Sequence, residues 1–455
     1  MQHNHERISF GSKLGAILAA AGSAVGLGNI WRFPYEAGNH GGAAFILIYL
    51  GCIFIFGLPI MVAEFTIGRK AKASTGGSFG VLAPGTQWKW VGYLGVLTGF
   101  LILGYYSVVA GWTLEYLLQS VTGGFHNKDA GGFISMFNNF SQDPFRPVLW
   151  LTIFMLMTHY VIVKGVKNGI ERSSKVLMPV LFILVILLAV CSVTLPNAGK
   201  GLEFLFKPDF SKVTADVFLG AMGQAFFSMS LGMGCLSTYA SYFGKDTRLA
   251  HTAMSVGLID TFVAILAGVI IFPAAFSVGI NPGAGPSLIF ITLPNVFDQA
   301  FSSVPFLASI CAAAFYILLA LAALTSTISL HEVSTAFLHE KFGLTRSRAA
   351  VLVSVGCWSI GVVSSLALGD WSGYTICGLN FFDALDFLTA KIMLPVSGML
   401  SAIFVGWYLD RNIVKGEATN YGSLKSTFYP IYIFILKYIA PIGILLIFLN
   451  ELKIF

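Results

Sequence analysis

Near its N-terminus the chain reads Gly22-Ser-Ala-Val-Gly-Leu-Gly-Asn-Ile-Trp-Arg-Phe-Pro-Tyr35, inside a long apolar segment. Three glycines fall within seven residues of this stretch, at positions 22, 26 and 28. Because each glycine disfavours a helix by about 1 kcal/mol, an uninterrupted helix is not expected here. Close packing of helices through small residues would explain the glycines, but it would not explain Asn29 and Arg32 in an apolar segment. The stretch therefore predicts an apolar helix that is broken near its middle.

A second stretch, about 200 residues later, repeats this pattern and reads Gly223-Gln-Ala-Phe-Phe-Ser-Met-Ser-Leu-Gly-Met-Gly234. Two interrupted apolar segments at corresponding places in two halves of a chain indicate the binding site of a membrane transporter. No water is available inside a bilayer, so the peptide groups at such a break must find other partners. Free carbonyl groups can coordinate Na⁺, and the N-terminus of a half-helix attracts a carboxylate. A zwitterionic solute together with a monovalent cation would fit both kinds of free end.

The composition excludes a water-soluble globular protein. The 455 residues are 56% hydrophobic and 14% aromatic, and their mean hydropathy is +0.80. Only 11% are charged, whereas a soluble domain carries about 25%. The net charge of +6 comes from residues that lie between apolar stretches, so nucleic acid is not expected as a partner. The six cysteines show no paired C-x-x-C spacing and are expected to be buried thiols.

The sequence predicts an all-α integral membrane protein embedded in the lipid bilayer. A helix needs roughly 20 apolar residues to cross a bilayer core, and about eleven segments satisfy this criterion. They lie at residues 13–36, 43–68, 90–120, 148–164, 175–195, 213–242, 252–278, 302–338, 348–368, 384–408 and 428–450. The broken segments are the first and the sixth. We therefore expect one transporter domain, 1–455, with two five-helix repeats of inverted topology at 13–195 and 213–408 and an additional helix at 428–450.

Lysine and arginine set the expected orientation, because short cytoplasmic loops carry the excess of positive charge. Arg7 and Lys13 precede the first segment, and Arg69, Lys70 and Lys72 follow the second. The loops after the fourth, sixth, eighth and tenth segments are also basic, and the alternate loops are poorer. The N-terminus is therefore expected in the cytoplasm, and an odd number of spans puts the C-terminus outside. Short loops and tails favour a bacterial inner membrane over an animal plasma membrane.

The first broken segment and the motif Gly41-Gly-Ala-Ala-Phe45 that follows it resemble the neurotransmitter:sodium symporter family. The similarity runs over nearly the whole chain, and the chain resembles bacterial hydrophobic amino-acid:sodium symporters of that family. The resemblance implies the leucine-transporter fold and a secondary active symporter, not an enzyme, that imports a neutral amino acid with two sodium ions by alternating access. Monoamine transporters of the family carry an Asp at the position of Gly26, where this chain has no charge. The implied substrate is therefore a hydrophobic or aromatic amino acid that brings its own carboxylate.

The resemblance also implies binding roles for individual positions. The implied substrate-binding residues are Ala24, Leu27, Gly28, Ile102, Tyr106, Phe227, Ser228, Ser230, Met233, Ser326 and Leu330. The implied ligands of the first sodium ion are Ala24, Asn29, Ser228 and Asp260, together with the substrate carboxylate. The implied ligands of the second sodium ion are Gly22, Val25, Ala322, Thr325 and Ser326. Tyr106 would bind the substrate carboxylate, and the carbonyls of Phe227 and Ser230 would receive its ammonium group.

Two pairs of charged residues resemble the gates of the family. Arg32 and Asp386 match the extracellular pair, and Arg7 and Glu340 match the cytoplasmic pair. Glu64, in the second span, is expected to hold amide groups of a broken helix. These positions are charged residues in or next to apolar spans, where charge is costly unless it has a partner.

The seventh span departs from the family pattern at Asp260, where the family has an Asn. Ala264 stands at the position that is associated with chloride dependence. A buried carboxylate is costly unless it is paired, so a sodium ion beside Asp260 would give the residue a physical reason to exist. We hypothesise that Asp260 supplies the negative charge that chloride provides in the animal relatives.

Three alternatives stay open at this point. A proton-coupled amino-acid transporter of the same fold would replace a sodium ion by a Lys or by a titrating carboxylate, and the hydroxyl pair Thr325 and Ser326 argues against it. A transport-inactive amino-acid sensor would carry the same motifs. An integral membrane enzyme is the third, but the chain has neither an H-E-x-x-H motif nor a cysteine spacing for a metal. None of these functions requires an oligomer.

Overall fold

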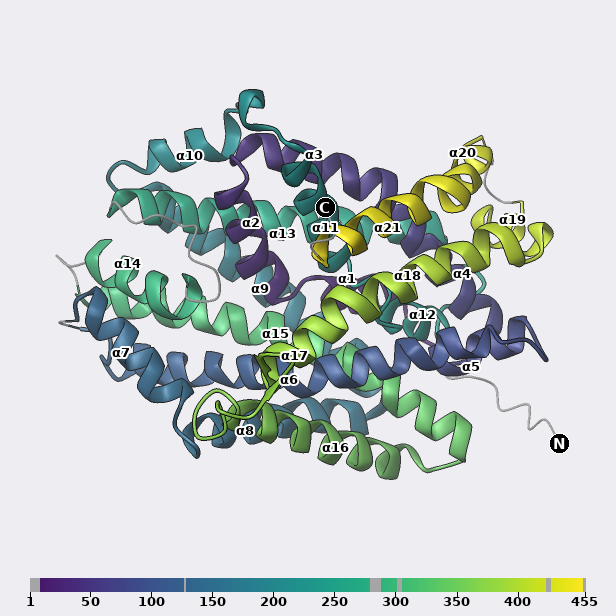
Figure 1. The fold of residues 1–455 in the computed structure, drawn as a ribbon, viewed down its shortest axis with the longest axis horizontal. Coiled ribbons are helices and arrows are strands. Elements are labelled where there is room, and N and C mark those ends of the chain that lie inside the picture. Colours follow the sequence, from purple (N-terminus) through teal and green to yellow (C-terminus); the bar gives the residue numbers. More distant parts are fainter. Residues whose placement is uncertain (1–8, 127, 279–287, 301–304, 423–426, 453–455) are drawn as a thin grey trace.

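The structure is a computed structural model that describes residues 9–126, 128–278, 288–300, 305–422 and 427–452. It is a bundle of helices with a two-stranded ribbon on its surface, in which β1 (Thr375–Ile376) and β2 (Leu379–Asn380) pair antiparallel (Figure 1). The helices are α1 (Lys13–Ala24), α2 (Phe33–Asn39), α3 (Ala43–Cys52), α4 (Leu58–Ala71), α5 (Thr75–Leu82), α6 (Lys89–Val121), α7 (Ala130–Ser141), α8 (Arg146–Val163), α9 (Arg172–Val193), α10 (Ala198–Phe206), α11 (Ala215–Ser228), α12 (Cys235–Ala240), α13 (Leu249–Ser277), α14 (Leu293–Ala300), α15 (Pro305–Phe342), α16 (Arg346–Leu366), α17 (Phe381–Asp386), α18 (Leu394–Ile403), α19 (Arg411–Ala418), α20 (Tyr429–Phe434) and α21 (Ala440–Glu451). Short π-helical turns continue or join them at Gly28–Arg32, Ile53–Gly57, Val166–Glu171, Leu288–Thr292, Phe387–Met393, Phe404–Tyr408 and Ile435–Ile439, and a 3₁₀ turn lies at Phe210–Lys212.

Apolar helices long enough to cross a bilayer make up most of the bundle. Within the described ranges there are nine: Ala43–Ala71, Lys89–Val121, Arg146–Val163, Val166–Val193, Leu249–Ser277, Phe306–Phe342, Arg346–Leu366, Phe381–Tyr408 and Tyr429–Glu451. The bent pair formed by Lys13–Ala24 and Gly28–Asn39 adds a tenth if it is one span. The predicted sixth span is divided between α11 and α12, and their 14 and 6 residues are too few to cross separately. The helical membrane fold is thus confirmed, while the count of eleven depends on joining these two halves.

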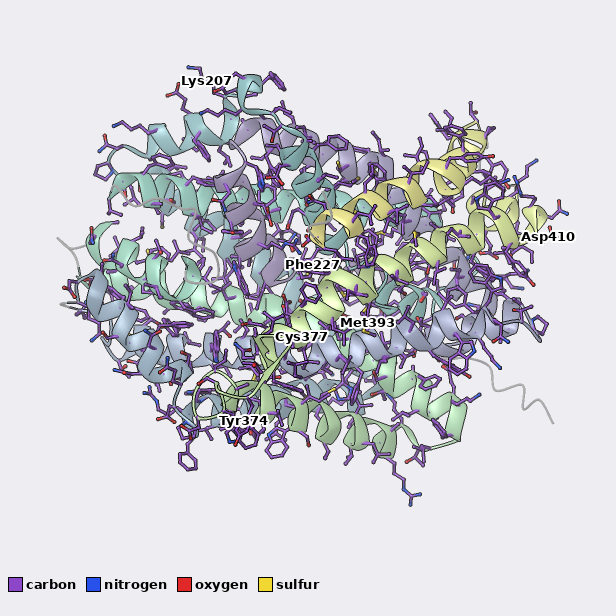
Figure 2. The ribbon with its side chains drawn as sticks, in the orientation of Figure 1. Lys207, Phe227, Tyr374, Cys377, Met393 and Asp410 are labelled. Carbon is purple, nitrogen blue, oxygen red and sulfur yellow. The ribbon has the colours of Figure 1, made fainter. Side chains whose placement is uncertain are left out.

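The outer surface of the bundle is apolar, as a lipid environment requires. Large apolar side chains such as Leu156 and Ile183 are more than half exposed, which would be unfavourable in water. Charged side chains such as Lys207 and Asp410 lie at the margins of the molecule, whereas Phe227 lies near its centre (Figure 2). The site that the sequence predicts around Phe227 is therefore enclosed by the helices.

The predicted break in the first span is present. α1 begins after Ser12, whose hydroxyl accepts a hydrogen bond from the backbone N–H of Gly15 at 3.0 Å. The helix ends at Ala24, because the next residue, Val25, has an extended backbone with ψ of 107°. The second half of the span is bent from α1 by 52°. The backbone N–H of Gly26, which the break leaves without a helical partner, donates to the side-chain oxygen of Asn29 at 2.9 Å.

The predicted break in the sixth span is present as well. α11 ends at Ser228, and the residues up to Cys235 form turns. Ser230, Gly232 and Gly234 have φ angles of +54°, +80° and +77°, so the right-handed helix cannot continue through them. Glycine adopts such angles without strain, whereas Ser230 does so at a cost.

Hydrogen bonds tie the two breaks to each other and to the second span. The Ser230 hydroxyl donates to the carbonyl of Ser23 at 2.8 Å. A carboxylate oxygen of Glu64 accepts the backbone N–H of Gly232 at 2.7 Å, which confirms the role expected for Glu64. These contacts satisfy peptide groups that would otherwise be unpaired in a medium without water.

Straight helices hold the broken ones in place. The two longest, α6 and α15, have 33 and 38 residues and pack against each other and against α8 and α16 in the lower half of Figure 1. α1 packs against α9, α13 and α15, and α12 packs against α4. α13 also packs against α2, so it holds both halves of the first broken span.

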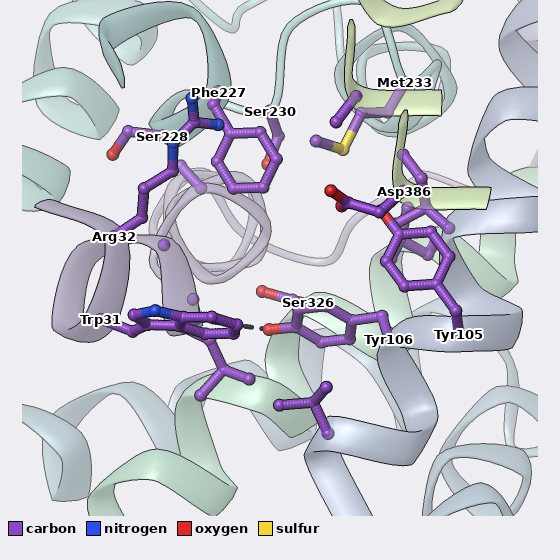
Figure 3. A pocket seen from close by; sticks show the side chains of 18 of the residues that line it. Trp31, Arg32, Tyr105, Tyr106, Phe227, Ser228, Ser230, Met233, Ser326 and Asp386 are labelled. Carbon is purple, nitrogen blue, oxygen red and sulfur yellow. Dashed lines mark hydrogen bonds between the residues drawn. The ribbon is translucent and has the colours of Figure 1, made fainter. Parts of the chain in front are cut away.

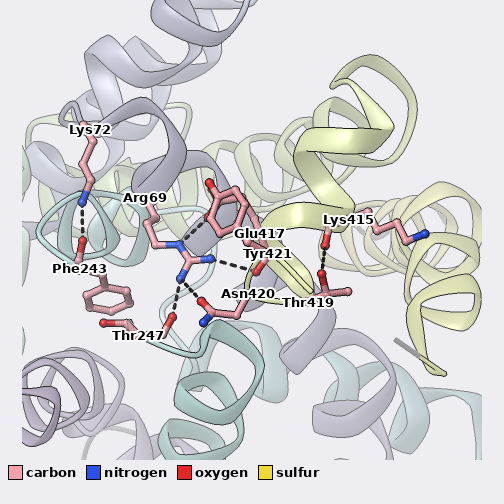
Figure 4. A network of polar contacts seen from close by, with 9 residues as sticks. All are labelled: Arg69, Lys72, Phe243, Thr247, Lys415, Glu417, Thr419, Asn420 and Tyr421. Carbon is pink, nitrogen blue, oxygen red and sulfur yellow. Dashed lines mark hydrogen bonds and ion pairs between the residues drawn. The ribbon is translucent and has the colours of Figure 1, made fainter. Parts of the chain in front are cut away.

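A buried ion pair joins three segments where α4 ends (Figure 4). Arg69 Nε donates to a carboxylate oxygen of Glu417 at 2.5 Å, and the two side chains are only 3% and 2% exposed. Arg69 also donates to the carbonyl of Thr247 and to the side chain of Asn420. Because breaking a buried pair by removing one partner costs about 3–5 kcal/mol, α19 and the loop after α12 are firmly attached to α4.

The left-handed backbone at Gly232 leads to a stability prediction. A Cβ atom at this position would lie 2.5 Å from the carbonyl oxygen of Leu394, and the φ of +80° strains any other residue. Gly232→Ala should therefore destabilise the fold by about 1–3 kcal/mol, measured as a lower midpoint of thermal unfolding in detergent. Gly51→Ala, in α3, is the control, since nothing lies within 4 Å of the added Cβ and alanine favours a helix. Equal midpoints for the two variants would contradict the prediction.

Candidate functional site

A cavity of about 490 Å³ lies between the two breaks, with α6 and α15 on its other sides. Every residue that the sequence predicts for the substrate lines it: Ala24, Leu27, Gly28, Ile102, Tyr106, Phe227, Ser228, Ser230, Met233, Ser326 and Leu330. In Figure 3, Phe227, Ser230 and Met233 of the sixth span face Tyr106 of α6 and Ser326 of α15. Residues from four separate parts of the chain are thus gathered around one space.

The polar end of the cavity is formed by the first break and Tyr106. The Tyr106 hydroxyl oxygen accepts a hydrogen bond from the backbone N–H of Leu27 at 3.3 Å. A Cβ atom on Gly26 would lie 2.6 Å from the Ser326 hydroxyl oxygen and 3.5 Å from that of Tyr106, so this position has no room for a side chain. A carboxylate placed here would meet a phenol and peptide N–H groups, both of which can donate hydrogen bonds to it.

The other end of the cavity is apolar. Ile102, Met233 and Leu330 are buried and line the cavity together with Phe227. A methionine side chain is flexible and polarisable, so it can adapt to ligands of different shape. This end suits an aliphatic or aromatic group and offers no charge for a polar one.

Asp260 is the centre of a buried cluster beside the cavity. One of its carboxylate oxygens accepts a hydrogen bond from the amide nitrogen of Asn29 at 2.6 Å. The other accepts from the hydroxyls of Ser228 at 2.8 Å and Tyr49 at 3.3 Å. All four side chains are at most 2% exposed. The structure thus brings together three of the predicted ligands of the first sodium ion, and the fourth, Ala24, lies on the adjacent cavity wall.

A second cluster of oxygens lies where α1 ends against α15. The hydroxyls of Thr325 and Ser326 both approach the carbonyl oxygen of Val25, each at 3.5 Å. Thr325 also donates to the carbonyl of Ala322 at 3.0 Å, and a Cβ atom on Gly22 would lie 3.2 Å from Thr325 Cβ. The five residues predicted for the second sodium ion are therefore neighbours.

The chemistry of both clusters fits a hard monovalent cation. Carboxylate, hydroxyl and carbonyl oxygens are the ligands that hard cations prefer. Across the described ranges, no group of three or more His, Cys, Asp and Glu side chains could hold a metal ion. The first cluster contains one carboxylate, which balances one positive charge, and the second contains none. Such weakly charged oxygen sites suit Na⁺ better than a divalent or transition metal.

Charged residues surround the mouth of the cavity, and both predicted outer gate residues line it. Arg32 Nε lies 3.5 Å from a carboxylate oxygen of Glu36, and its guanidinium lies 4.7 Å from the centre of the Phe227 ring. Asp386 instead accepts a hydrogen bond from the hydroxyl of Tyr105 at 3.1 Å. In the part of the chain that the structure describes, no ion pair joins Arg32 to Asp386. The predicted partners therefore share the mouth of the cavity without touching.

The predicted inner gate is only partly visible. Arg7 lies outside the described residues, and Glu340 accepts the backbone N–H of Ser74 at 2.7 Å. The N-terminal segment is nevertheless held near this end, because the N–H of Phe10 donates to the carbonyl of Tyr242 at 3.1 Å and their rings pack edge to face.

One short motif needs a separate explanation, because Gly76-Gly-Ser-Phe-Gly80 matches the G-x-S-x-G pattern of hydrolases. In the structure Ser78 is buried inside α5, and its hydroxyl donates to the carbonyls of Ala73 and Ser74 at 2.8 and 2.9 Å. A nucleophilic serine would instead be exposed on a sharp turn between a strand and a helix. The motif is a small-residue helix and does not indicate an esterase.

Several residues of the site received no role from the sequence, among them Tyr49, Lys391 and Glu451. Tyr49 hydrogen-bonds the Asp260 cluster, and Lys391 and Glu451 line the cavity mouth with 3.1 Å between their charged groups. A phenol in an apolar span needs a hydrogen-bond partner, so Tyr49 could have been suspected. No signal in a single sequence links Lys391 to Glu451, which lie on different spans.

Comparison with known proteins identifies the class of the protein. The model of the sodium:neurotransmitter symporter family matches residues 7–131 and 133–455. The chain therefore belongs to this family and is a sodium-dependent membrane transporter, not an enzyme.

Individual relatives show how similar the chain is to particular members. It is 37% identical to an uncharacterized sodium-dependent transporter of Haemophilus influenzae, covering 99% of both chains, and 35% identical to the transporter YhdH of Bacillus subtilis, covering 98% of both. Among solved structures it is similar to MhsT in complex with L-phenylalanine, with a TM-score of 0.88 and 47% identity over 98% of this chain and 100% of that one.

The hydroxyl of Tyr49 should contribute to sodium binding through Asp260. Tyr49→Phe removes a hydrogen bond that orients the carboxylate, and losing an orienting partner at a metal site costs about tenfold or more in affinity. We expect the sodium concentration that half-maximally stabilises the protein against thermal unfolding to rise about tenfold. Tyr374→Phe deletes the same hydroxyl from an exposed loop residue and should leave the curve unchanged. Superimposable curves for Tyr49→Phe and the wild type would rule out the contribution.

Proposed function

We propose that the protein is a sodium-coupled secondary active symporter that imports a neutral, hydrophobic or aromatic amino acid by alternating access. The observation that carries this proposal is that both oxygen clusters share residues with the wall of the cavity. Ser228 belongs to the Asp260 cluster and to the wall, and Ser326 belongs to the Val25 cluster and to the wall. A solute in the cavity and ions in the clusters would therefore order the same side chains, which is the physical basis of coupling.

The binding mode follows from the two ends of the cavity. The substrate carboxylate would lie at the Tyr106 hydroxyl and complete the shell of the first sodium ion. Its ammonium group would be received by the carbonyls of Phe227 and Ser230 at the sixth break, where the Phe227 carbonyl also accepts the backbone N–H of Ser230 at 3.1 Å. Its side chain would fill the apolar end. The similarity to MhsT, whose solved structure is a complex with L-phenylalanine, supports this substrate class.

Two sodium ions would supply enough free energy for steep accumulation. Each ion gains about 2.3 kcal/mol per 100 mV of membrane potential and about 1.4 kcal/mol per tenfold gradient. Two ions together provide roughly 7 kcal/mol, which corresponds to about 10⁵-fold accumulation of a neutral zwitterion. The first ion would bind at Ala24, Asn29, Ser228 and Asp260, and the second at Gly22, Val25, Ala322, Thr325 and Ser326.

Transport would proceed by movement of the broken helices relative to the straight ones. We assign the repeats to 13–195 and 213–408 and the additional helix to 428–450, in an inner membrane with the N-terminus in the cytoplasm. Arg32 with Asp386 would close the outer side, and Arg7 with Glu340 the inner side. No step requires an oligomer.

Sodium and chloride dependence test the coupling and the role of Asp260. In proteoliposomes, uptake of labelled L-phenylalanine should stop when Na⁺ is replaced by choline, because both ion sites would be empty. It should continue when chloride is replaced by gluconate, because Asp260 supplies the negative charge. Asp260→Asn should abolish the chloride-independent uptake, whereas Glu203→Gln, which removes an exposed carboxylate paired with Lys207 just past the end of α10, should not.

Each failure of that experiment has a separate meaning. Uptake that is indifferent to Na⁺ would favour a proton-coupled transporter. Loss of uptake in gluconate would contradict the role of Asp260 alone. Sodium-dependent binding without any uptake would favour a transport-inactive sensor.

The uncharged Gly26 predicts selectivity for amino acids over amines. Phenethylamine has the ring and ammonium group of phenylalanine but no carboxylate, and position 26 offers no anion to replace it. We expect phenethylamine to compete with L-phenylalanine at least about 100-fold more weakly, because a charged hydrogen-bonding group is lost. Competition binding in detergent measures the ratio, with L-leucine as the control ligand that keeps the carboxylate. Equal competition by the amine would contradict the proposed orientation.

A further inference from the structure

The carboxylate of Glu451, at the end of α21, reaches the mouth of the cavity although it belongs to the last span. One of its oxygens lies 3.8 Å from Arg32 Nη2, and the other lies 3.1 Å from Lys391 Nζ. All three side chains line the cavity and are about one quarter to one third exposed. Glu451 therefore lies between a cation of the first span and a cation of the tenth.

The carboxylates near Arg32 are of two kinds, one on its own half-helix and two on other spans. Glu36 lies one turn further along the same half-helix, so it moves together with Arg32 and cannot distinguish one position of that half-helix from another. Glu451 and Asp386 lie on other spans, and both line the same cavity. In this structure Arg32 is close to Glu451, while Asp386 is occupied by the hydroxyl of Tyr105.

We propose that Glu451 is a positioning residue that holds Arg32 away from Asp386 and so favours the open mouth. Closure of the mouth requires Arg32 to exchange Glu451 for Asp386. Lys391 fixes the carboxylate during this exchange, because its contact with Glu451 is the shorter of the two and does not involve the first span. The additional span thereby contributes a side chain to the gate of a site that the two five-helix repeats otherwise form.

The chemistry of the contact sets the size of the effect. Arg32 and Glu451 are partly exposed and 3.8 Å apart, so the pair is weak and easily exchanged. Pairs of this kind correspond to a change of about 1.5- to 5-fold in an equilibrium constant. A weak pair is suited to this task, since a strong one would trap the mouth in one state.

Glu451→Gln tests the proposal, because glutamine keeps the shape of the side chain and removes its charge. Spin labels on the native exposed Cys377 and on Phe218→Cys, with Cys191→Ser, report the separation of α11 from the turn before α17 by double electron–electron resonance. In Glu451→Gln the ratio of open to closed populations should fall about 1.5- to 5-fold. Glu203→Gln, the matched control, should match the wild type.

A second variant separates gating from a general effect on the last span. In an Arg32→Gln background the guanidinium that Glu451 holds is absent, so adding Glu451→Gln should leave the populations unchanged. The proposal is overturned if Glu451→Gln behaves like Glu203→Gln, or if its shift persists in the Arg32→Gln background. The inference rests on the gate of the proposed function, but its readout needs neither a substrate nor uptake, so failure of sodium-coupled transport would be seen separately.

Discussion

The structure depends on the cost of leaving peptide groups unpaired where no water can reach them. Two helices are interrupted at mid-length, and each backbone N–H or C=O group that loses its helical hydrogen bond needs a partner from a residue at a fixed position. Asn29 performs this task with both ends of its amide, since its oxygen accepts the N–H of Gly26 and its nitrogen donates to Asp260. The amide of Gln224 likewise donates to the carbonyl of Gly28 at 3.3 Å. Ser230, whose hydroxyl donates to the carbonyl of Ser23, combines this task with a place on the wall of the cavity.

The breaks and the span pattern could be predicted from the sequence, because glycines and polar residues inside apolar segments are local signals, whereas the binding residues were implied by the resemblance to a family. The motif of the first break also made the family recognisable, and with it Asp260 and the residues around it. The partner of Arg32 on another span could not be predicted, because such an ion pair depends on how distant spans pack and on which state the mouth adopts. Glu451 is the clearest example, since nothing around it in the sequence indicates that the end of the last helix reaches the first.

The two ends of the site differ in how tightly their charges are held. Asp260 is fully buried and has three side-chain donors, so its position is well defined before any ion arrives. Arg32 at the mouth is partly exposed, and its contacts are 3.5 Å or longer. A rigid oxygen cluster beneath a loosely held mouth would suit the sodium-coupled transport that we propose, because ion binding needs rigid ligands while gating needs contacts that exchange quickly.

The Arg69–Glu417 pair has a practical consequence for anyone who modifies this protein. The connection between the tenth and the last span contains α19, and its Glu417 is the counter-charge of a guanidinium that is almost completely buried. Replacing that connection by a generic linker, or inserting an epitope into it, would leave the buried guanidinium of Arg69 without its counter-charge. The turn between β1 and β2 is free of this difficulty, since Cys377 is exposed and Gly378 has open space around it. Affinity tags and antibody epitopes are best placed at that turn.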